Sequence, residues 1–163
     1  MLTNKEAMDF ILKIEEPFKS LPHLPKGVVE FIVKITPYLA LLGAILGLVA
    51  VFPLLMAGGA VSILSLSGTL LVWTLVTVVV TLANSVIMFM AYTPLKNKEM
   101  KGWMLLFWSE VISVVSSLFG LFAGQTNIVG TLIGVVIGLY ILFEMKPFYM
   151  GTVEGEIISK LKK

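Results

Sequence analysis

The chain has 163 residues, of which 58% are hydrophobic and 13% are charged. Soluble domains average about 45–50% apolar and about 25% charged residues, so this composition indicates a membrane protein. The formal net charge of +2 gives no indication of a nucleic-acid partner. Cysteine is absent, which excludes disulfides and thiolate catalysis, and arginine is absent too, which excludes bidentate guanidinium clamps.

Residues 1–26 predict a cytoplasmic amphipathic helix followed by a proline-rich linker. Apolar side chains recur at near-helical spacing up to Phe18, and the segment Leu-Pro-His-Leu-Pro at 21–25 favours an extended link. Such a helix either binds a partner or senses lipid, or lies at the membrane interface and anchors the bundle, and we expect the second. His23, the only histidine, is expected to be a solvated linker residue.

Two long apolar stretches follow. Residues 35–95 contain no charged side chain, and residues 102–145 contain only Glu110 and Glu144. A membrane-crossing helix needs about 20 apolar residues, so each stretch accommodates two spans and a short turn. The predicted spans are residues 33–56, 69–93, 103–123 and 128–145.

We therefore expect an all-α membrane protein. Its four transmembrane helices form an antiparallel bundle over residues 27–146, and the N-terminal amphipathic helix lies at the cytoplasmic membrane interface. Residues 147–163 form a polar cytoplasmic tail.

All 12 basic residues are lysines, and all of them lie on one side of this pattern. The loops expected on the other side, near residues 57–68 and 124–128, carry no ionisable side chain. Because cytoplasmic loops are enriched in lysine, we expect a multi-pass protein of the cell membrane with both termini cytoplasmic. Partners that recognise charge, lipid headgroups included, are then expected on the cytoplasmic face.

Two ionic contacts and an aromatic belt are expected at this boundary. Glu30 and Lys34 stand four residues apart with the acid first, which favours an intrahelical pair. Glu144 is expected to be neutralised by Lys34 or Lys101. Rings with a wet edge are expected at Tyr92, Trp103, Trp108, Tyr140 and Tyr149.

Several short segments carry a family resemblance. They are Leu-Pro-His-Leu-Pro-Lys at 21–26, Pro-Leu-Lys at 94–96, Lys-Gly-Trp at 101–103, Leu-Phe at 106–107 and Gly-Leu-Tyr-Ile-Leu-Phe at 138–143. Over residues 20–146 the chain is similar to small four-span membrane proteins of candidate-phyla bacteria. That resemblance implies the four-span topology and a bacterial inner membrane. The family has no assigned activity, so the resemblance implies no site residue.

Glu110 is the one acid well inside a predicted span, about 10 Å along the helix from Trp103. A carboxylate at that depth is expected to face protein or water, or to be partnered. Asn84 and Ser85 lie at a similar depth on the preceding span, and Ser113 is one turn beyond Glu110. We expect an intramembrane polar cluster of these four residues. It acts either as an interhelical clasp or as the proton or cation site of a transporter.

Glycines at four-residue spacing mark candidate packing faces. Gly43 and Gly47 lie on the first span, and Gly130, Gly134 and Gly138 lie on the fourth. Such faces let helix backbones approach closely in lipid, and the alternative interpretation is a permeation path. Whether the fourth-span face meets this chain or a second protomer is left open.

We expect no catalytic, cofactor-binding or metal-ligating residues. The sequence has no metal-ligand cluster, no nucleophile–histidine arrangement and no phosphate-cradling glycine loop. Our leading hypothesis is a structural or accessory membrane protein that is not an enzyme and acts by helix–helix association with itself or a membrane protein partner. The alternative is a small oligomeric transporter or channel with Glu110 as its titrating site.

Overall fold

The computed structural model describes residues 4–122 and 128–161; for residues 4–8, 121–122 and 152–161 it describes the backbone only. All regular structure in these ranges is helical. The elements are α1 (Asn4–Glu15), the 3₁₀ helix η1 (Glu16–Ser20), α2 (Lys26–Pro53), the π-helical turn η2 (Leu54–Gly58), α3 (Gly59–Leu64), α4 (Gly68–Lys96), α5 (Met100–Phe122) and α6 (Ile128–Leu161).

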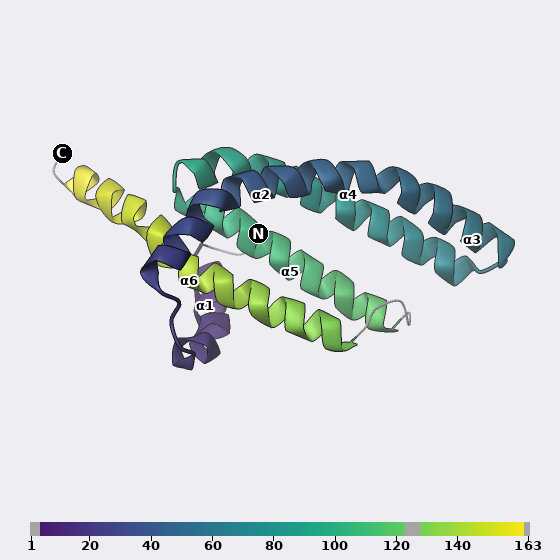
Figure 1. Cartoon of the computed structure of the whole chain (residues 1–163), viewed down its shortest axis with the longest axis horizontal. Helices are drawn as coiled ribbons and strands as arrows, with labels where there is room; N and C mark the ends of the chain where they lie inside the picture. Colours follow the sequence, from purple (N-terminus) through teal and green to yellow (C-terminus); the bar gives the residue numbers. More distant parts are fainter. Residues whose placement is uncertain (1–3, 123–127, 162–163) are drawn as a thin grey trace.

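Four long apolar helices pack antiparallel, which confirms the predicted fold class. In the described part of the chain, four helical segments are long and apolar enough to cross a membrane. Figure 1 shows α2 and α4 side by side as one long hairpin, with α5 and α6 as a second hairpin against it. The protein is therefore a multi-pass membrane protein by the length and composition of its helices.

The two hairpins are held together mainly at one end. This end comprises α1, η1, the start of α2, the end of α4, the start of α5 and the C-terminal half of α6. We call it the lysine-bearing end, because the described lysines from Lys13 to Lys146 lie on these elements and the turn between α4 and α5. The buried apolar cluster of the protein lies there, with Trp103, Phe107 and Tyr149 at 0% exposure.

The opposite end is different in character. Its helices present large apolar side chains outward, such as Phe52 and Ile63, each 70% exposed. In lipid such exposure carries no hydrophobic penalty, because acyl chains are as apolar as the side chains. The helices therefore pack around a buried core at the lysine-bearing end, and the spans are packed less tightly beyond it.

The first predicted outer loop, near residues 57–68, is mostly helical. The chain continues from α2 through η2 and α3 to Leu64, and only the short turn before Gly68 is non-helical. Pro53 lacks an N–H and its ring clashes with the preceding turn, which accounts for the π-helical turn beginning at Leu54. The second predicted outer turn, at residues 124–127, lies outside the described residues.

The helix from Lys26 to Leu64 spans 39 residues, or about 58 Å at the standard rise. The hydrocarbon core of a bilayer is only about 30 Å thick. The α2–α4 hairpin must therefore tilt strongly or extend its far end into the interface.

α1 docks on the bundle rather than standing apart from it. Ile11 is 1% exposed, and the Phe10 ring stacks on Trp108 with 6.3 Å between centroids. Phe18 of η1 contacts Phe143 of α6 with 5.4 Å between centroids. Part of the apolar face that the sequence predicts thus packs against α5 and α6, while Leu12 is 46% exposed.

The turn between α4 and α5 explains why residue 102 is a glycine. A Cβ added at Gly102 would lie 2.6 Å from the Leu95 backbone nitrogen and 2.8 Å from the Pro94 carbonyl carbon. Backbone at that distance cannot move aside as a flexible side chain can, so only glycine allows this approach. The close turn sets Trp103 into the core directly after it.

Candidate functional site

Asn84 is the centre of a polar clasp between α4 and α5. Its Nδ2 donates to Ser113 Oγ at 3.0 Å, and its Oδ1 accepts from Ser109 Oγ at 3.2 Å. Ser113 Oγ also donates to the Ser109 carbonyl, one turn earlier on α5, at 3.0 Å. One amide thus satisfies a donor and an acceptor on consecutive turns of the facing helix. Bonds of this kind are worth about 1 kcal/mol between membrane helices.

Ser109 is the member of this clasp that the sequence interpretation did not select. It is 2% exposed, more deeply buried than Asn84 itself. The available signal was its four-residue spacing from Ser113, which places both hydroxyls on one face of α5.

Glu110 does not join the clasp. Its Oε1 would lie 2.8 Å from a Cβ built on Gly138, so the carboxylate faces α6 rather than α4. Consecutive helical residues point about 100° apart, which separates Glu110 from Ser109 and hence from Asn84. Among the described residues, the Glu110 carboxylate has no hydrogen bond or ion pair.

Ser85 is also separated from Asn84, although the two are neighbours in sequence. Its Oγ donates to the Thr81 carbonyl of its own helix at 2.8 Å. A Cβ added at Gly47 of α2 would lie 2.2 Å from that Oγ. The expected four-residue cluster is therefore distributed over three helix contacts: Asn84 with Ser113 on α5, Ser85 with Gly47 on α2, and Glu110 with Gly138 on α6.

The five predicted packing glycines fall into two groups. Gly43, Gly47 and Gly138 lie close to Met88, Ser85 and Glu110 within the chain. Among the described residues, an added Cβ at Gly130 or Gly134 would meet no atom within 4 Å, and both positions are exposed. The second group is therefore on an outward face of α6.

A second polar group fastens the N-terminal segment to α6 at the lysine-bearing end. His23 Nδ1 lies 2.7 Å from Glu144 Oε1, and the Leu24 backbone nitrogen donates to Glu144 Oε2 at 3.2 Å. Lys146, 4% exposed, is paired with Glu15 at the end of α1. Glu144 is thus held by the linker, not by Lys34 or Lys101. His23 is 74% exposed, as expected of a solvated linker residue, and it also contacts Glu144.

The aromatic belt is only partly exposed to water. Trp103 is fully buried and donates from Nε1 to the Leu142 carbonyl at 2.7 Å. Tyr149 is likewise buried at 0% exposure. Tyr140 is half-buried and donates from its hydroxyl to the Pro22 carbonyl of the linker. These rings bind the N-terminal segment, α5 and α6 together, a role that residue type alone does not reveal.

The fold and these contacts define a small helical membrane protein of four candidate spans. Comparison with protein-family models, with curated proteins and with solved structures found no match.

Proposed function

We propose that the protein is a small accessory membrane protein that acts through helix–helix association, with a second copy of itself or with another membrane protein, and not through catalysis. The observation that carries the proposal is the outward glycine face of α6. Gly134 is exposed, and an added Cβ there would meet no atom of the described residues within 4 Å. The flanking Ile133 and Ile137 are 55% and 51% exposed.

Glycine at such a position has a cost that lipid does not offset. Glycine destabilises a helix interior by roughly 1 kcal/mol relative to alanine, and acyl chains pack as well against a bulky side chain. A close-approaching neighbour helix does require glycine. Gly138, four residues further along α6, already lies close to Glu110 of α5. The distribution of the lysines supports a cytoplasmic position for the lysine-bearing end.

Substituting Gly134 with isoleucine is expected to disrupt assembly while leaving the monomer folded, since the added side chain enters open space. The measurement is the oligomeric state of the purified protein in mild detergent, by light scattering and by crosslinking in native membranes. Leu132→Ile is the matched control, because Leu132 is 58% exposed on the same helix and already bulky. If Gly134→Ile and Leu132→Ile assemble equally, the proposal fails.

A second candidate function is a small oligomeric transporter or channel, and the position of Glu110 favours it. The carboxylate is half-buried between α5 and α6. The clasp on α5 is completed by Asn84 without it. Acids in membrane spans that face protein without a fixed partner commonly lie on ion or proton pathways.

Under this second function, proteoliposomes should show a pH-dependent proton or cation flux that Glu110→Gln abolishes. The thermal unfolding of the variant should match that of the unsubstituted protein, since no described hydrogen bond is lost. Glu99→Gln, in the turn between α4 and α5, is the control acid outside the spans. No flux in either protein would leave accessory association as the function, whereas flux that persists in Glu110→Gln would mean that Glu110 is not the titrating site.

A further inference from the structure

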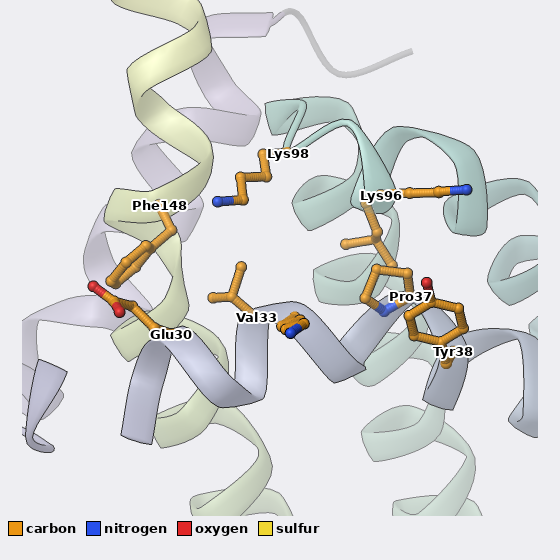
Figure 2. A pocket seen from close by; sticks show the side chains of 9 residues that line it. Glu30, Val33, Pro37, Tyr38, Lys96, Lys98 and Phe148 are labelled. Carbon is orange, nitrogen blue, oxygen red and sulfur yellow. The ribbon is translucent and has the colours of Figure 1, made fainter. Parts of the chain in front are cut away.

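A cavity of about 390 Å³ opens at the lysine-bearing end, between the start of α2, the end of α4 and the C-terminal half of α6. It is lined by Glu30, Val33, Lys34, Pro37, Tyr38, Leu95, Lys96, Lys98 and Phe148. Figure 2 shows Lys98 extending its ammonium group across the opening toward Phe148, with Lys96 pointing outward on the other side. None of the polar contacts described above uses this cavity.

The charge around the cavity is predominantly positive. Among the described residues, three lysines and one carboxylate line it. The expected Glu30–Lys34 ion pair is not formed, although both side chains line the cavity. Within the described residues, Lys34 and Lys96 have no hydrogen bond or ion pair. Two ammonium groups at the edge of the spans therefore lack a neutralising partner there.

The backbone holds the basic turn in place. α4 ends at Lys96, and the Lys98 N–H donates to the Leu95 carbonyl at 3.0 Å. Lys98 has a positive φ of 56°, which is costly for a residue other than glycine. Asn97 Nδ2 donates to Glu99 Oε1 at 3.0 Å, so the one acid of the turn is engaged outside the cavity. The hydrogen bond and the backbone conformation of Lys98 thus set the position from which its side chain extends across the opening.

The cavity combines this charge with apolar surface at the depth where a lipid headgroup lies. Val33, Pro37 and Leu95 are buried lining residues. Tyr38 is 57% exposed and meets Tyr92 edge-on, with 6.3 Å between ring centroids.

A surface suited to an acyl chain continues along α2 from Tyr38. Leu42, Ile45 and Val49 follow at helical spacing, and are 51%, 50% and 64% exposed. Inorganic phosphate has no apolar part that could contact this surface, whereas the acyl chain of a phospholipid could.

We propose that this cavity binds the phosphate group of an anionic phospholipid, with Lys34 and Lys98 at the phosphate, Lys96 adding its charge from the outer edge of the opening, and an acyl chain along the Tyr38 side of α2. Basic pockets between membrane helices bind anionic headgroups in this way, and each lysine near the surface contributes to the attraction. Without arginine the phosphate is held by point charges, so binding depends on the number of lysines rather than on one bidentate contact. The proposal does not depend on the assembly proposed above.

The test compares two double variants of equal charge. Lys34→Gln/Lys96→Gln removes the two lysines of the cavity that have no described partner. Lys26→Gln/Lys101→Gln removes two exposed lysines of the same end that do not line the cavity. Native mass spectrometry measures the fraction of protein that retains phosphatidylglycerol or phosphatidylcholine after extraction from mixed vesicles. We expect the cavity variant to bind phosphatidylglycerol roughly ten-fold more weakly than the control variant.

Three outcomes would overturn the proposal. Equal weakening in both double variants would mean that phosphatidylglycerol follows general surface charge. Equal retention of phosphatidylcholine and phosphatidylglycerol by the unsubstituted protein would mean that the headgroup charge is not recognised. Inorganic phosphate that displaces the lipid at equal concentration would mean that the site recognises a free anion. Thermal unfolding of each variant checks that the fold is retained.

Discussion

Replacing Trp103 with alanine is expected to lower the free energy of unfolding by about 3–5 kcal/mol, the range for removing a large aromatic side chain from a packed core. Trp103 is 0% exposed, and its ring stacks on Phe107 with 5.6 Å between centroids. Its Nε1 also donates to the Leu142 carbonyl across the α5–α6 contact at 2.7 Å. Unfolding in detergent by a titration of denaturing surfactant, followed by circular dichroism, measures the change.

Two further variants separate the causes. Trp103→Phe keeps most of the ring but loses the indole N–H, so we expect a loss of about 1 kcal/mol from the hydrogen bond, with some further loss of volume. Phe119→Ala, on the same helix but 61% exposed toward the lipid, should cost much less. If Phe119→Ala and Trp103→Ala are equally destabilising, the compact core at the lysine-bearing end is not the main source of stability.

Removing the charge of Glu15 is expected to destabilise the protein by about 3 kcal/mol, the lower part of the range for breaking a buried ion pair. The Lys146 side chain is 6% exposed and that of Glu15 is 19% exposed. The lysine charge is therefore the less solvated of the two and depends more on its ion-pair partner. In Glu15→Gln the ammonium group would remain buried, 5.6 Å from the centre of the Trp103 ring. Hydrogen exchange of the α1 backbone, measured beside global unfolding, shows whether the helix detaches first.

The matched control is Glu16→Gln, whose side chain is exposed on the adjacent residue. It should change stability by less than about 0.5 kcal/mol, as surface substitutions usually do. Combining Glu15→Gln with Lys146→Met should recover much of the loss, because the unpaired charge is then gone. An unrecovered double variant would indicate that the pair supplies stability beyond charge compensation.

The spans were predictable from one sequence because the cost of placing a residue in the bilayer depends mainly on its type. Charged side chains are costly in hydrocarbon, so the uncharged residues 35–95 and the nearly uncharged residues 102–145 had to contain the helices. Helix ends were harder to predict. The fourth span is predicted to end at residue 145, and α6 continues beyond it as a helix to Leu161. The glycine-rich segment 57–62 was expected to be a loop, but it is helical, because glycine does not by itself terminate a membrane helix.

The candidate site was predictable in its residue types but not in its grouping. Asn84 is predicted from its depth in the second span and Ser113 from its position one turn beyond Glu110, and the two are hydrogen-bonded. Depth does not define direction around the helix axis, however, so Ser85 and Glu110 were assigned to the same cluster although they face α2 and α6. The rotation of each helix about its axis depends on packing against its neighbours.

The sequence by itself determined the class of protein, the number of spans and the end that carries the lysines, because each follows from the summed cost of placing residue types in lipid. Tertiary structure alone decided which polar and small residues meet. The His23–Glu144 contact joins positions 121 residues apart, and the Glu15–Lys146 pair joins positions 131 apart. The cavity at the lysine-bearing end likewise draws its lining from three helices. Such contacts depend on how separate helices are rotated and shifted against one another, and the packing of the whole chain determines that arrangement.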